Sequence, residues 1–345
     1  MSMRSKKPVR FFMLLLAIAL SGLSACLQSP DCFREDVFCA GLVTNSSGIK
    51  DFGLNQHTWE GLQEARRLDI ADHVAYIESV DSRDYFKNIE EFAKHGYDVV
   101  ITIGPAMDDE TLQAADQYPD SVYIGMDQPH EETRPNVLPI IFPEDQMGFW
   151  AGALAARITR TGTVGAACET SGLDSMWRYC EGFRKGVAYV DEDVQALVVY
   201  RDNRGSETLF IDEEWGRLSA QELVEQGADV VFAAGGGTAQ AALLAAAEMG
   251  ARVIGAERDQ ARALPETAEA LVTSIYGGAR LEVQNWMRFI QAESVWEGNQ
   301  IGGVEHASYS SFESQVSESL KSEMDELLES LYTGILGTEV PQSAP

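Results

Sequence analysis

Polar side chains stand where several apolar runs of this 345-residue chain end. Carboxylates and amides at such points can hydrogen-bond the hydroxyl groups and amide edges of a small molecule, and paired carboxylates can also act as general acid and base. The residues concerned are Asn45, Asp51 and Asn55 after the run at 37–43, Asp127 after 121–126, and Glu257 after 251–256. A second interpretation stays open for Asp51 and Asn55, because either could cap a helix over 56–68.

Glycines and aromatic residues add to these candidates. Gly236 and Gly237 begin a helix-like stretch and could bring the backbone close to a ligand, although the same glycines also suit a tight strand-to-helix turn. The stretch lacks the Gly-Lys-Ser/Thr ending of a phosphate-binding P-loop. Trp177, Tyr179 and Phe210 lie in segments predicted near the same strand ends, and we expect these aromatic rings to stack on a ligand.

The sequence offers little for covalent catalysis or metal binding. Its five histidines lack metal-ligand spacing, and no Gly-x-Ser-x-Gly motif occurs. Because the chain has 54 Asp and Glu residues, a nearby carboxylate pair is weak evidence for acid–base catalysis. We therefore expect no enzyme, no metal site and no cofactor.

The elements that position these residues are predicted from hydrophobic patterning. Runs that are apolar on both faces and alternate with amphipathic stretches indicate an α/β fold, with parallel sheets covered by helices on both sides. We predict strands at 37–43, 74–78, 98–103, 121–126, 137–142, 162–168, 194–200, 228–234, 251–256 and 270–276, and helices at 59–68, 149–158, 240–249, 281–292 and 311–331. Residues 343–345 are expected to be a frayed end.

The two halves of the chain repeat one plan. The segment from Asp98 to Gly125 spans strand, helix and strand over 27 positions, and the segment from Asp229 to Gly255 does the same over 26. Ligands of open parallel sheets bind beyond the carboxyl ends of the strands. Two facing lobes would therefore enclose the candidate residues in a shared cleft.

The first residues predict export and anchoring. Basic residues precede the apolar run 11–20, which is too short to span a bilayer, and Leu23-Ser-Ala-Cys26 follows. This pattern is similar to a bacterial lipobox, so 1–26 is read as a lipoprotein signal peptide, Cys26 as the lipidated residue and 27–36 as a linker. The alternative is a plain cleavage site with a chance cysteine.

Four cysteines remain after Cys26. An oxidising compartment favours two local disulfides, Cys32 with Cys39 and Cys168 with Cys180. A four-cysteine zinc site is the competing interpretation, but neither pair has the spacing of a zinc knuckle.

The mature chain is strongly acidic. Without the four basic residues that precede Cys26, 22 Lys and Arg residues face 54 Asp and Glu residues, a formal charge of −32. Such a field repels polyanions, so nucleic acid is excluded as a partner.

Five motifs, in order along nearly all of the mature chain, carry a resemblance to a known family. They are Val43–Gly48, Asp51–Gly61, Ile101–Gly104, Gly235–Thr238, and Val253–Gly255 with Asp259-Gln260. The chain resembles the basic membrane protein family of bacterial lipoproteins, which are solute-binding proteins of ABC importers; several bind purine nucleosides. The resemblance implies two Rossmann-like domains with parallel sheets, joined by three hinge crossovers in a type I periplasmic binding protein architecture.

The resemblance also implies roles for single residues. Asp51 and Asn55 would be first-loop contacts with Asn45 beside them, Asp127 a partner of ligand hydroxyls, Phe210 a base-stacking ring, Gly236 and Gly237 a backbone wall, and Glu257 a ribose partner. Three positions depart from the family pattern. Leu54 replaces a common Phe, Glu257 a usual Asp, and Gly277 an expected Lys.

These observations predict a lipid-anchored monomer in the cell envelope that closes around a nucleoside-like solute and serves an ABC permease and its ATPase. The predicted lobes are 37–142 plus 277–306, and 143–276 plus 307–338, with crossings near 140–148, 274–278 and 305–311. Two alternatives stay open. One is an exported nucleoside hydrolase that uses Asp51 and Asp127; the other is a ligand-sensing lipoprotein.

Overall fold

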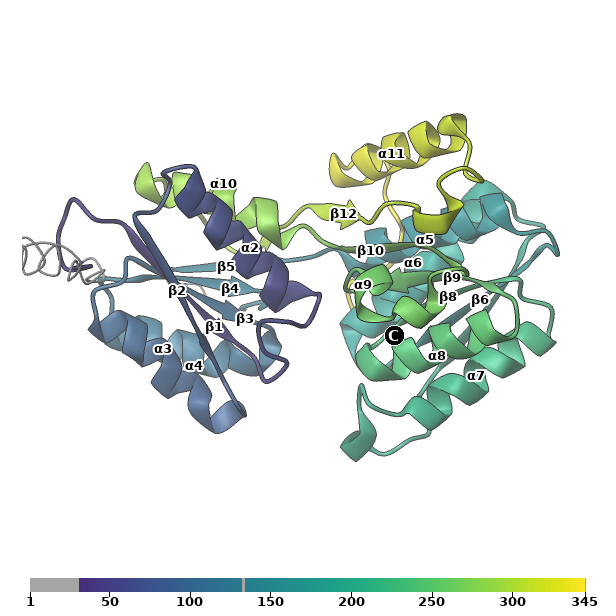
Figure 1. Cartoon of the computed structure of the whole chain (residues 1–345), viewed down its shortest axis with the longest axis horizontal. Coiled ribbons are helices and arrows are strands. Elements are labelled where there is room, and N and C mark those ends of the chain that lie inside the picture. Colours follow the sequence, from purple (N-terminus) through teal and green to yellow (C-terminus); the bar gives the residue numbers. More distant parts are fainter. Residues whose placement is uncertain (1–30, 132–133, 345) are drawn as a thin grey trace, which may run out of the picture.

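Two sheets of six strands each form two lobes that lie side by side along the length of the molecule (Figure 1). The computed structural model describes residues 31–131 and 134–344. The predicted signal peptide and Cys26 therefore lie outside the described residues. Among the residues that are described, no helix has the length and apolarity needed to cross a membrane.

The first sheet has the strand order β11-β5-β4-β3-β1-β2, and all its pairings are parallel. Helices α2 and α10 cover one face, and α3 and α4 cover the other (Figure 1). The strands are β1 (Cys39–Thr44), β2 (His73–Glu78), β3 (Val99–Ile103), β4 (Val122–Met126), β5 (Val137–Ile141) and β11 (Gln300–Ile301), and the helices are α2 (Leu54–Arg67), α3 (Tyr85–Lys94), α4 (Asp108–Gln117) and α10 (Ala279–Gln291).

The second sheet has the order β12-β10-β9-β8-β6-β7, in which only the pair β10–β12 is antiparallel. Helices α5 and α6 lie on one face, α7 and α8 on the other, and α11 packs on α5. The strands are β6 (Thr163–Cys168), β7 (Gln195–Tyr200), β8 (Val230–Ala234), β9 (Arg252–Ala256), β10 (Leu271–Gly277) and β12 (Val304–His306), and the helices are α5 (Glu144–Ile158), α6 (Asp174–Val190), α7 (Glu213–Glu225), α8 (Gly236–Glu248), α9 (Gln260–Ala263) and α11 (Glu318–Tyr332).

The predicted strands all form, and the strands at the centre of each sheet are buried on both faces. Every residue of β1, β3 and β8 is buried, as expected for strands covered by helices on each side. The predicted helix 311–331 was too long at its start. It begins at Glu318, where the Ser317 side chain accepts a hydrogen bond from the Leu320 N–H.

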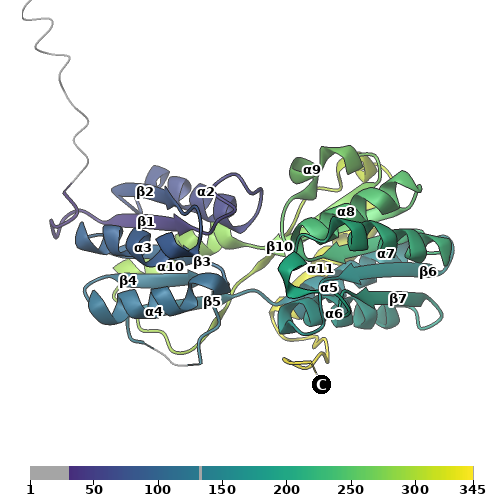
Figure 2. The same ribbon diagram turned by 90° about the horizontal axis from the view of Figure 1, so that it is seen from below.

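The chain crosses between the sheets three times (Figure 2). It leaves β5 for α5 through Phe142 and leaves β10 for α10 through Gly278, within the predicted ranges 140–148 and 274–278. The third crossing differs from the expected 305–311: it lies at Gly302-Gly303, between β11 and β12. Because β12 pairs with β10, residues 304–306 belong to the second sheet and not, as predicted, to the first lobe.

Helices α5 and α6 interlock through glycines. A Cβ atom at Gly148 or Gly152 would stand 2.0 or 2.1 Å from a carbonyl oxygen of α6, and one at Gly182 or Gly186 would stand 2.2 or 1.9 Å from a carbonyl oxygen of α5. These distances leave room for hydrogen only. The two helices therefore pack backbone against backbone, and both begin at the interlobe cleft.

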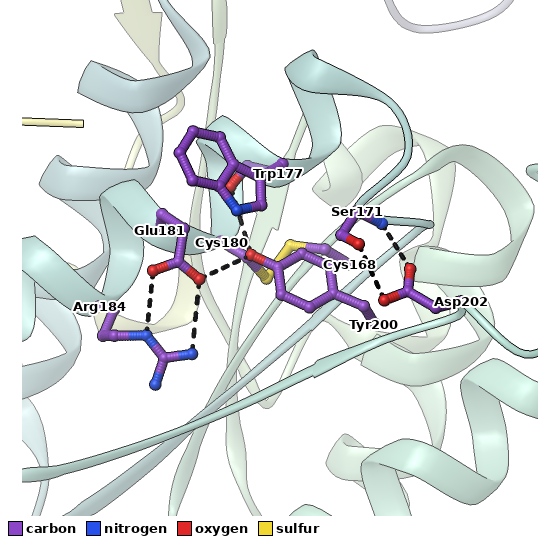
Figure 3. Close-up of a disulfide and its surroundings, with 8 residues drawn as sticks. All are labelled: Cys168, Ser171, Trp177, Cys180, Glu181, Arg184, Tyr200 and Asp202. Atoms are coloured by element: carbon purple, nitrogen blue, oxygen red, sulfur yellow. Dashed lines mark hydrogen bonds and ion pairs between the residues drawn. A yellow bond between two sulfur atoms is a disulfide. The ribbon is translucent and has the colours of Figure 1, made fainter. Parts of the chain in front are cut away.

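Both expected disulfides, Cys32–Cys39 and Cys168–Cys180, are present. The second joins the end of β6 to the second turn of α6, as Figure 3 shows. Beside it, the Tyr200 hydroxyl donates to a Glu181 carboxylate oxygen 2.9 Å away. Helix α6 is thus tied to its own sheet by a covalent and a polar contact.

Candidate ligand-binding site

A cavity of about 490 Å³ opens between the two lobes at the carboxyl ends of both sets of strands. Its volume is in the range of small-molecule sites, about 300–1,000 Å³. From the first lobe it is lined by Asn45, Ser47, Asp51, Leu54, Gly104, Pro105 and Asp127; from the crossovers by Phe142 and Gly277; and from the second lobe by Glu144, Met147, Ser175, Met176, Tyr179, Phe210, Ile211, Gly236, Gly237, Glu257 and Arg258.

Two predicted contact residues do not line this cavity. Trp177 follows Met176 on α6, so it points about 100° away from the cleft-facing side of the helix. Figure 3 shows it near the Cys168–Cys180 disulfide instead. Asn55 is fully buried under the first loop. The prediction that these two side chains contact a ligand directly is therefore wrong, while the other predicted residues line one cleft.

The first loop is held by a network that includes both predicted polar residues. Asp51 Oδ1 accepts from the N–H groups of Gly53 and Gln56, at 2.9 and 3.0 Å, so the capping interpretation holds for Asp51. Asn55 Nδ2 donates to Asp51 Oδ2 and to Asn45 Oδ1, both at 2.9 Å. Asn55 thus orients Asn45 and Asp51, which face the cleft.

Asp127 and Glu257 occupy equivalent positions in the two lobes. Each comes two residues after a glycine that ends the repeated strand–helix–strand unit, Asp127 after β4 and Glu257 after β9. Both have left-handed backbones, with φ of 58° and 68°. Such conformations are unfavourable for residues with a side chain and gather at functional sites. The internal repeat therefore places one carboxylate on each side of the cleft.

Gly236 and Gly237 can offer a ligand only the surface of their turn, because both of their N–H groups are already hydrogen-bonded within the protein. Gly236 N–H donates to Glu257 Oε2 at 2.9 Å, and Gly237 N–H donates to the Phe210 carbonyl at 2.8 Å. The possibility that these groups bind an anion is therefore wrong for this arrangement. A Cβ at Gly236 would also stand 2.9 Å from the Phe210 carbonyl oxygen, so the turn packs closely on the loop that carries the aromatic ring.

Phe210 is placed by a buried ion pair that the sequence did not reveal. Its backbone is left-handed, with φ of 65°, and its N–H donates to Glu169 Oε2 at 3.0 Å. Glu169 directly follows β6 and pairs with Arg201, which directly follows β7; their side chains are 0% and 1% exposed. Arg201 also donates to the Gly205 carbonyl at 3.1 Å. The pair thus anchors both ends of the loop that presents Phe210.

The lobes touch along one rim of the cleft. Arg258 Nη1 donates to the Asp51 carbonyl oxygen at 3.0 Å, and the Arg262 guanidinium lies 5.4 Å from the centre of the Phe52 ring. Both arginines belong to the second lobe, and the Asp51 carbonyl and the Phe52 ring belong to the first. The contacts show that the two lobes can approach through the first loop and the segment after β9.

Phe142 occupies the junction of the three crossovers. Its ring is 5% exposed, and a Cβ at Gly277 or Gly302 would stand 2.5 or 2.6 Å from it. Gly277 is the position at which the resemblance led us to expect Lys. The ring therefore fills the space into which a side chain at that position would extend.

This packing makes a prediction about Gly277. We expect Gly277→Lys alone to lower the free energy of unfolding by about 1–3 kcal/mol, because overpacking a filled site forces the ring or the backbone to move. When Phe142 is already replaced by Ala, adding Gly277→Lys should lower the free energy of unfolding by less than it does in the parent. Urea denaturation of the four proteins in a double-mutant cycle measures the coupling; additive changes would contradict the packing.

The Asp127 carboxyl has an unusual environment. Burial raises its pKa to about 7, and the nearby Glu144 and Glu257 act in the same direction, while Arg178 opposes them. No hydrogen bond of the Asp127 carboxyl is found within the described residues. A carboxyl group in this setting is suited to a ligand donor that can replace the missing contacts.

The raised pKa predicts a pH-dependent stability difference. Between about pH 4 and 7 the folded protein holds a proton on Asp127 that the unfolded chain has lost, so Asp127 destabilises the fold progressively as the pH rises. Asp127→Asn should therefore equal the parent near pH 4 and be more stable above pH 7. Thermal unfolding at both pH values checks this expectation, with Asp120→Asn, at an exposed position two residues before β4, as the control. A constant difference across the pH range would contradict it.

No cluster of three metal-ligating side chains occurs in the described part of the chain. The cleft instead offers carboxylates, the Asn45 amide, two thioethers and the aromatic rings of Phe142, Tyr179 and Phe210. These groups are suited to a polar, partly aromatic organic molecule.

Comparison with known proteins places this geometry in a family. Residues 39–324 match the model of the Bmp family, described as PnrA-like ABC transporter substrate-binding proteins. The CD4+ T-cell-stimulating antigen of Listeria monocytogenes is 28% identical over 269 residues, covering 72% of this chain and 73% of that protein. The ABC transporter nucleoside-binding protein BmpA of Lactococcus lactis is 28% identical over 201 residues, 57% of this chain and 55% of that protein.

Solved structures agree on the fold. The solute-binding protein of an ABC transporter system from Conexibacter woesei superposes with a TM-score of 0.72 at 19% identity, covering 88% of this chain and 99% of that one. The two-lobed α/β architecture with three crossovers is that of type I periplasmic binding proteins. The chain therefore belongs to the Bmp family of PnrA-like ABC transporter substrate-binding proteins.

Proposed function

We propose that this protein is a lipid-anchored solute-binding protein of an ABC importer and that it binds a purine nucleoside or a related molecule between its lobes. One observation carries the proposal: Asp127 and Glu257, at equivalent positions of the two lobes, line one cleft together with the Phe210 ring. Carboxylates can accept hydrogen bonds from sugar hydroxyls, and the ring can stack on a base. The Lactococcus lactis relative, named a nucleoside-binding protein, supports this ligand class.

The available interactions are strong enough for such a ligand. Stacking a base on an aromatic ring contributes about 1–3 kcal/mol, and a hydrogen bond to a charged group contributes about 1.5–3 kcal/mol. Micromolar affinity requires about 8 kcal/mol in total. One ring and two or three charged contacts therefore suffice.

The proposed mechanism is hinge closure. A ligand that touches Asp127 in one lobe and Phe210 in the other binds best when the lobes are close, so it shifts the population toward the closed form. The three crossovers are the hinge. The closed form would then engage the permease and its ATPase, and no covalent step is needed.

We predict that nucleosides bind more tightly than their monophosphates. A phosphate would meet Asp51, Asp127 and Glu257, and the Gly236 and Gly237 N–H groups already have acceptors. Like charges in a desolvated site cost several kcal/mol, so the monophosphate Kd should be more than about tenfold higher. Calorimetric titration of each nucleoside beside its monophosphate gives the ratio, and a tighter monophosphate would overturn the prediction.

An exported nucleoside hydrolase that uses Asp51 and Asp127 is the alternative. The hydrogen bonds of Asp51 to its own loop favour a structural role for that carboxylate over catalysis. Incubation with a nucleoside panel separates the two functions: a thermal shift with intact nucleoside supports the binding protein, and release of free base supports the hydrolase.

Attachment through Cys26 and a monomeric state complete the proposal. Cys26→Ser should release the protein from the membrane fraction, and the intact mass of the parent should show the lipid.

A ligand-sensing lipoprotein would share the anchor and the closure but would act without a permease. Ligand uptake by cells with and without the gene distinguishes importer from sensor.

A further inference from the structure

The segment Thr338–Ala344 follows the last helix and lies against the starts of α5 and α6, beside α6 in Figure 2. The Thr338 hydroxyl donates to Asp145 Oδ2 on α5, and the Ala344 N–H donates to Asp174 Oδ1 on α6 at 3.1 Å. Thr338 and Val340 are 7% and 8% exposed. The expectation of a frayed end is therefore wrong as far as Ala344.

Arg178 connects this segment to the cleft. Its Nη1 donates to the Gln342 carbonyl oxygen at 2.7 Å, while its Nε and Nη2 donate to Glu144 Oε2 at 3.0 and 2.7 Å. Glu144 lines the cavity and is 6% exposed. The guanidinium is thus held by the C-terminal segment on one side and neutralises a cleft carboxylate on the other.

The first turns of α6 are fixed from two directions. The disulfide of Cys180 ties the second turn to β6 (Figure 3). The C-terminal segment ties the first turn through Asp174 and Arg178. Met176 and Tyr179, which line the cavity, lie between these two attachments.

We infer that residues Thr338–Ala344 are a positioning element of the ligand cleft, which holds the Arg178 guanidinium on Glu144 and so sets the charge of the cleft wall. The consequence for ligand affinity rests on the proposed function. The segment lies beyond residues 39–324, which match the family model. The family match therefore assigns this segment no role.

Glu144 lies close to other carboxylates, so the negative charge of the cleft wall depends on its neutralisation by Arg178. Asp145 is its neighbour on α5, Asp127 faces it from the first lobe, and Arg178 is the cation that opposes both. Burial raises the pKa of Glu144, and Arg178 lowers it. A loosened guanidinium would leave the cleft wall with less compensated negative charge, or with an extra proton.

Two variants separate the backbone contact from side-chain effects. Deletion of residues 342–345 removes both contacts of this part of the segment with α6, the Gln342 carbonyl that Arg178 contacts and the Ala344 N–H that donates to Asp174, and keeps the buried Thr338 and Val340. Gln342→Ala keeps that carbonyl, because the contact is made by the backbone, and is the matched control. Lys185→Ala removes the contact of the segment with Glu339, at 3.6 Å, without touching Arg178, and serves as a second control.

Two measurements are made on each protein. The first is the rate at which phenylglyoxal modifies Arg178, followed by peptide mass spectrometry without any ligand. The second is the calorimetric Kd of whichever purine nucleoside of a panel binds the parent most tightly. We expect the deletion to speed modification several-fold and to raise the Kd about tenfold, the effect of one charged hydrogen bond, with both controls at parent values.

Equal modification rates in the deletion variant and the parent would overturn the inference, as would faster modification with an unchanged Kd. If no nucleoside binds any of the proteins, the nucleoside proposal fails. The modification rates then still decide whether the segment holds Arg178.

Discussion

Gly182→Ala should unfold at a markedly lower temperature than the parent. An alanine Cβ at this position would stand 2.2 Å from the Asp145 carbonyl oxygen and 3.0 Å from the Phe149 nitrogen, both backbone atoms of α5. Neither can move unless the helix moves. Overpacking of this kind costs about 1–3 kcal/mol or more, although alanine within a helix is otherwise favoured over glycine by about 1 kcal/mol.

Whether Gly182→Ala lowers or raises the free energy of unfolding therefore shows which of these two effects is larger. Urea denaturation of Gly182→Ala should give a lower midpoint with a similar slope. Gly337→Ala is the control, because a Cβ there has no neighbour within 4 Å and its backbone needs no left-handed conformation. A stabilised Gly182→Ala protein would mean that α5 and α6 are not packed backbone against backbone. Because both helices begin at the cleft, we also expect weaker ligand binding.

Glu169→Gln should lose about 3–5 kcal/mol of stability, since removing one partner of a buried ion pair leaves the other charge uncompensated. Arg201 would keep Asp212 at 3.3 Å, but its fully buried partner would be neutral. The amide would also offer a weaker acceptor to the Phe210 N–H. Ligand affinity should therefore fall along with stability, because Phe210 is left-handed and depends on this anchor.

Asp36→Asn is the matched control for this substitution. It makes the same carboxylate-to-amide change in a pair with Arg34 whose side chains are 60% and 70% exposed. Exposed pairs contribute little to stability, so no measurable change is expected. Equal effects of Glu169→Gln and Asp36→Asn on the urea midpoint would show that the buried pair does not anchor the loop.

The strands and much of the cleft could be predicted because each left a local signal. Apolar runs mark the strands, including the part-exposed edge strands β2 and β7, and the strand-end rule then places Asp127 and Glu257 at the carboxyl edges of the two sheets. The third crossing was misplaced since β11 and β12 are only two and three residues long. Strands of that length have no hydrophobic period to read.

Other parts of the site depend on contacts between distant residues. Glu169 with Arg201, Glu144 with Arg178, and Phe142 with Gly277 join separate elements, and nothing in the local sequence marks either partner. The error at Trp177 has a different cause. The start of α6 fixes which residues face the cleft, and a shift of one residue turns a side chain by about 100°. The structure brings Tyr179, a predicted stacking residue, to the cavity, and Met176 lies there in place of Trp177.

Binding of one ligand by both lobes at once is the central claim, and calorimetry on paired variants tests it most directly. Asp127→Asn changes the first lobe and Phe210→Leu the second, with Asp120→Asn as the control. A purine nucleoside should bind the parent and the control one to one, and each cleft variant should raise the Kd at least about tenfold, the loss of one strong contact. Unchanged affinity in either cleft variant would contradict this claim.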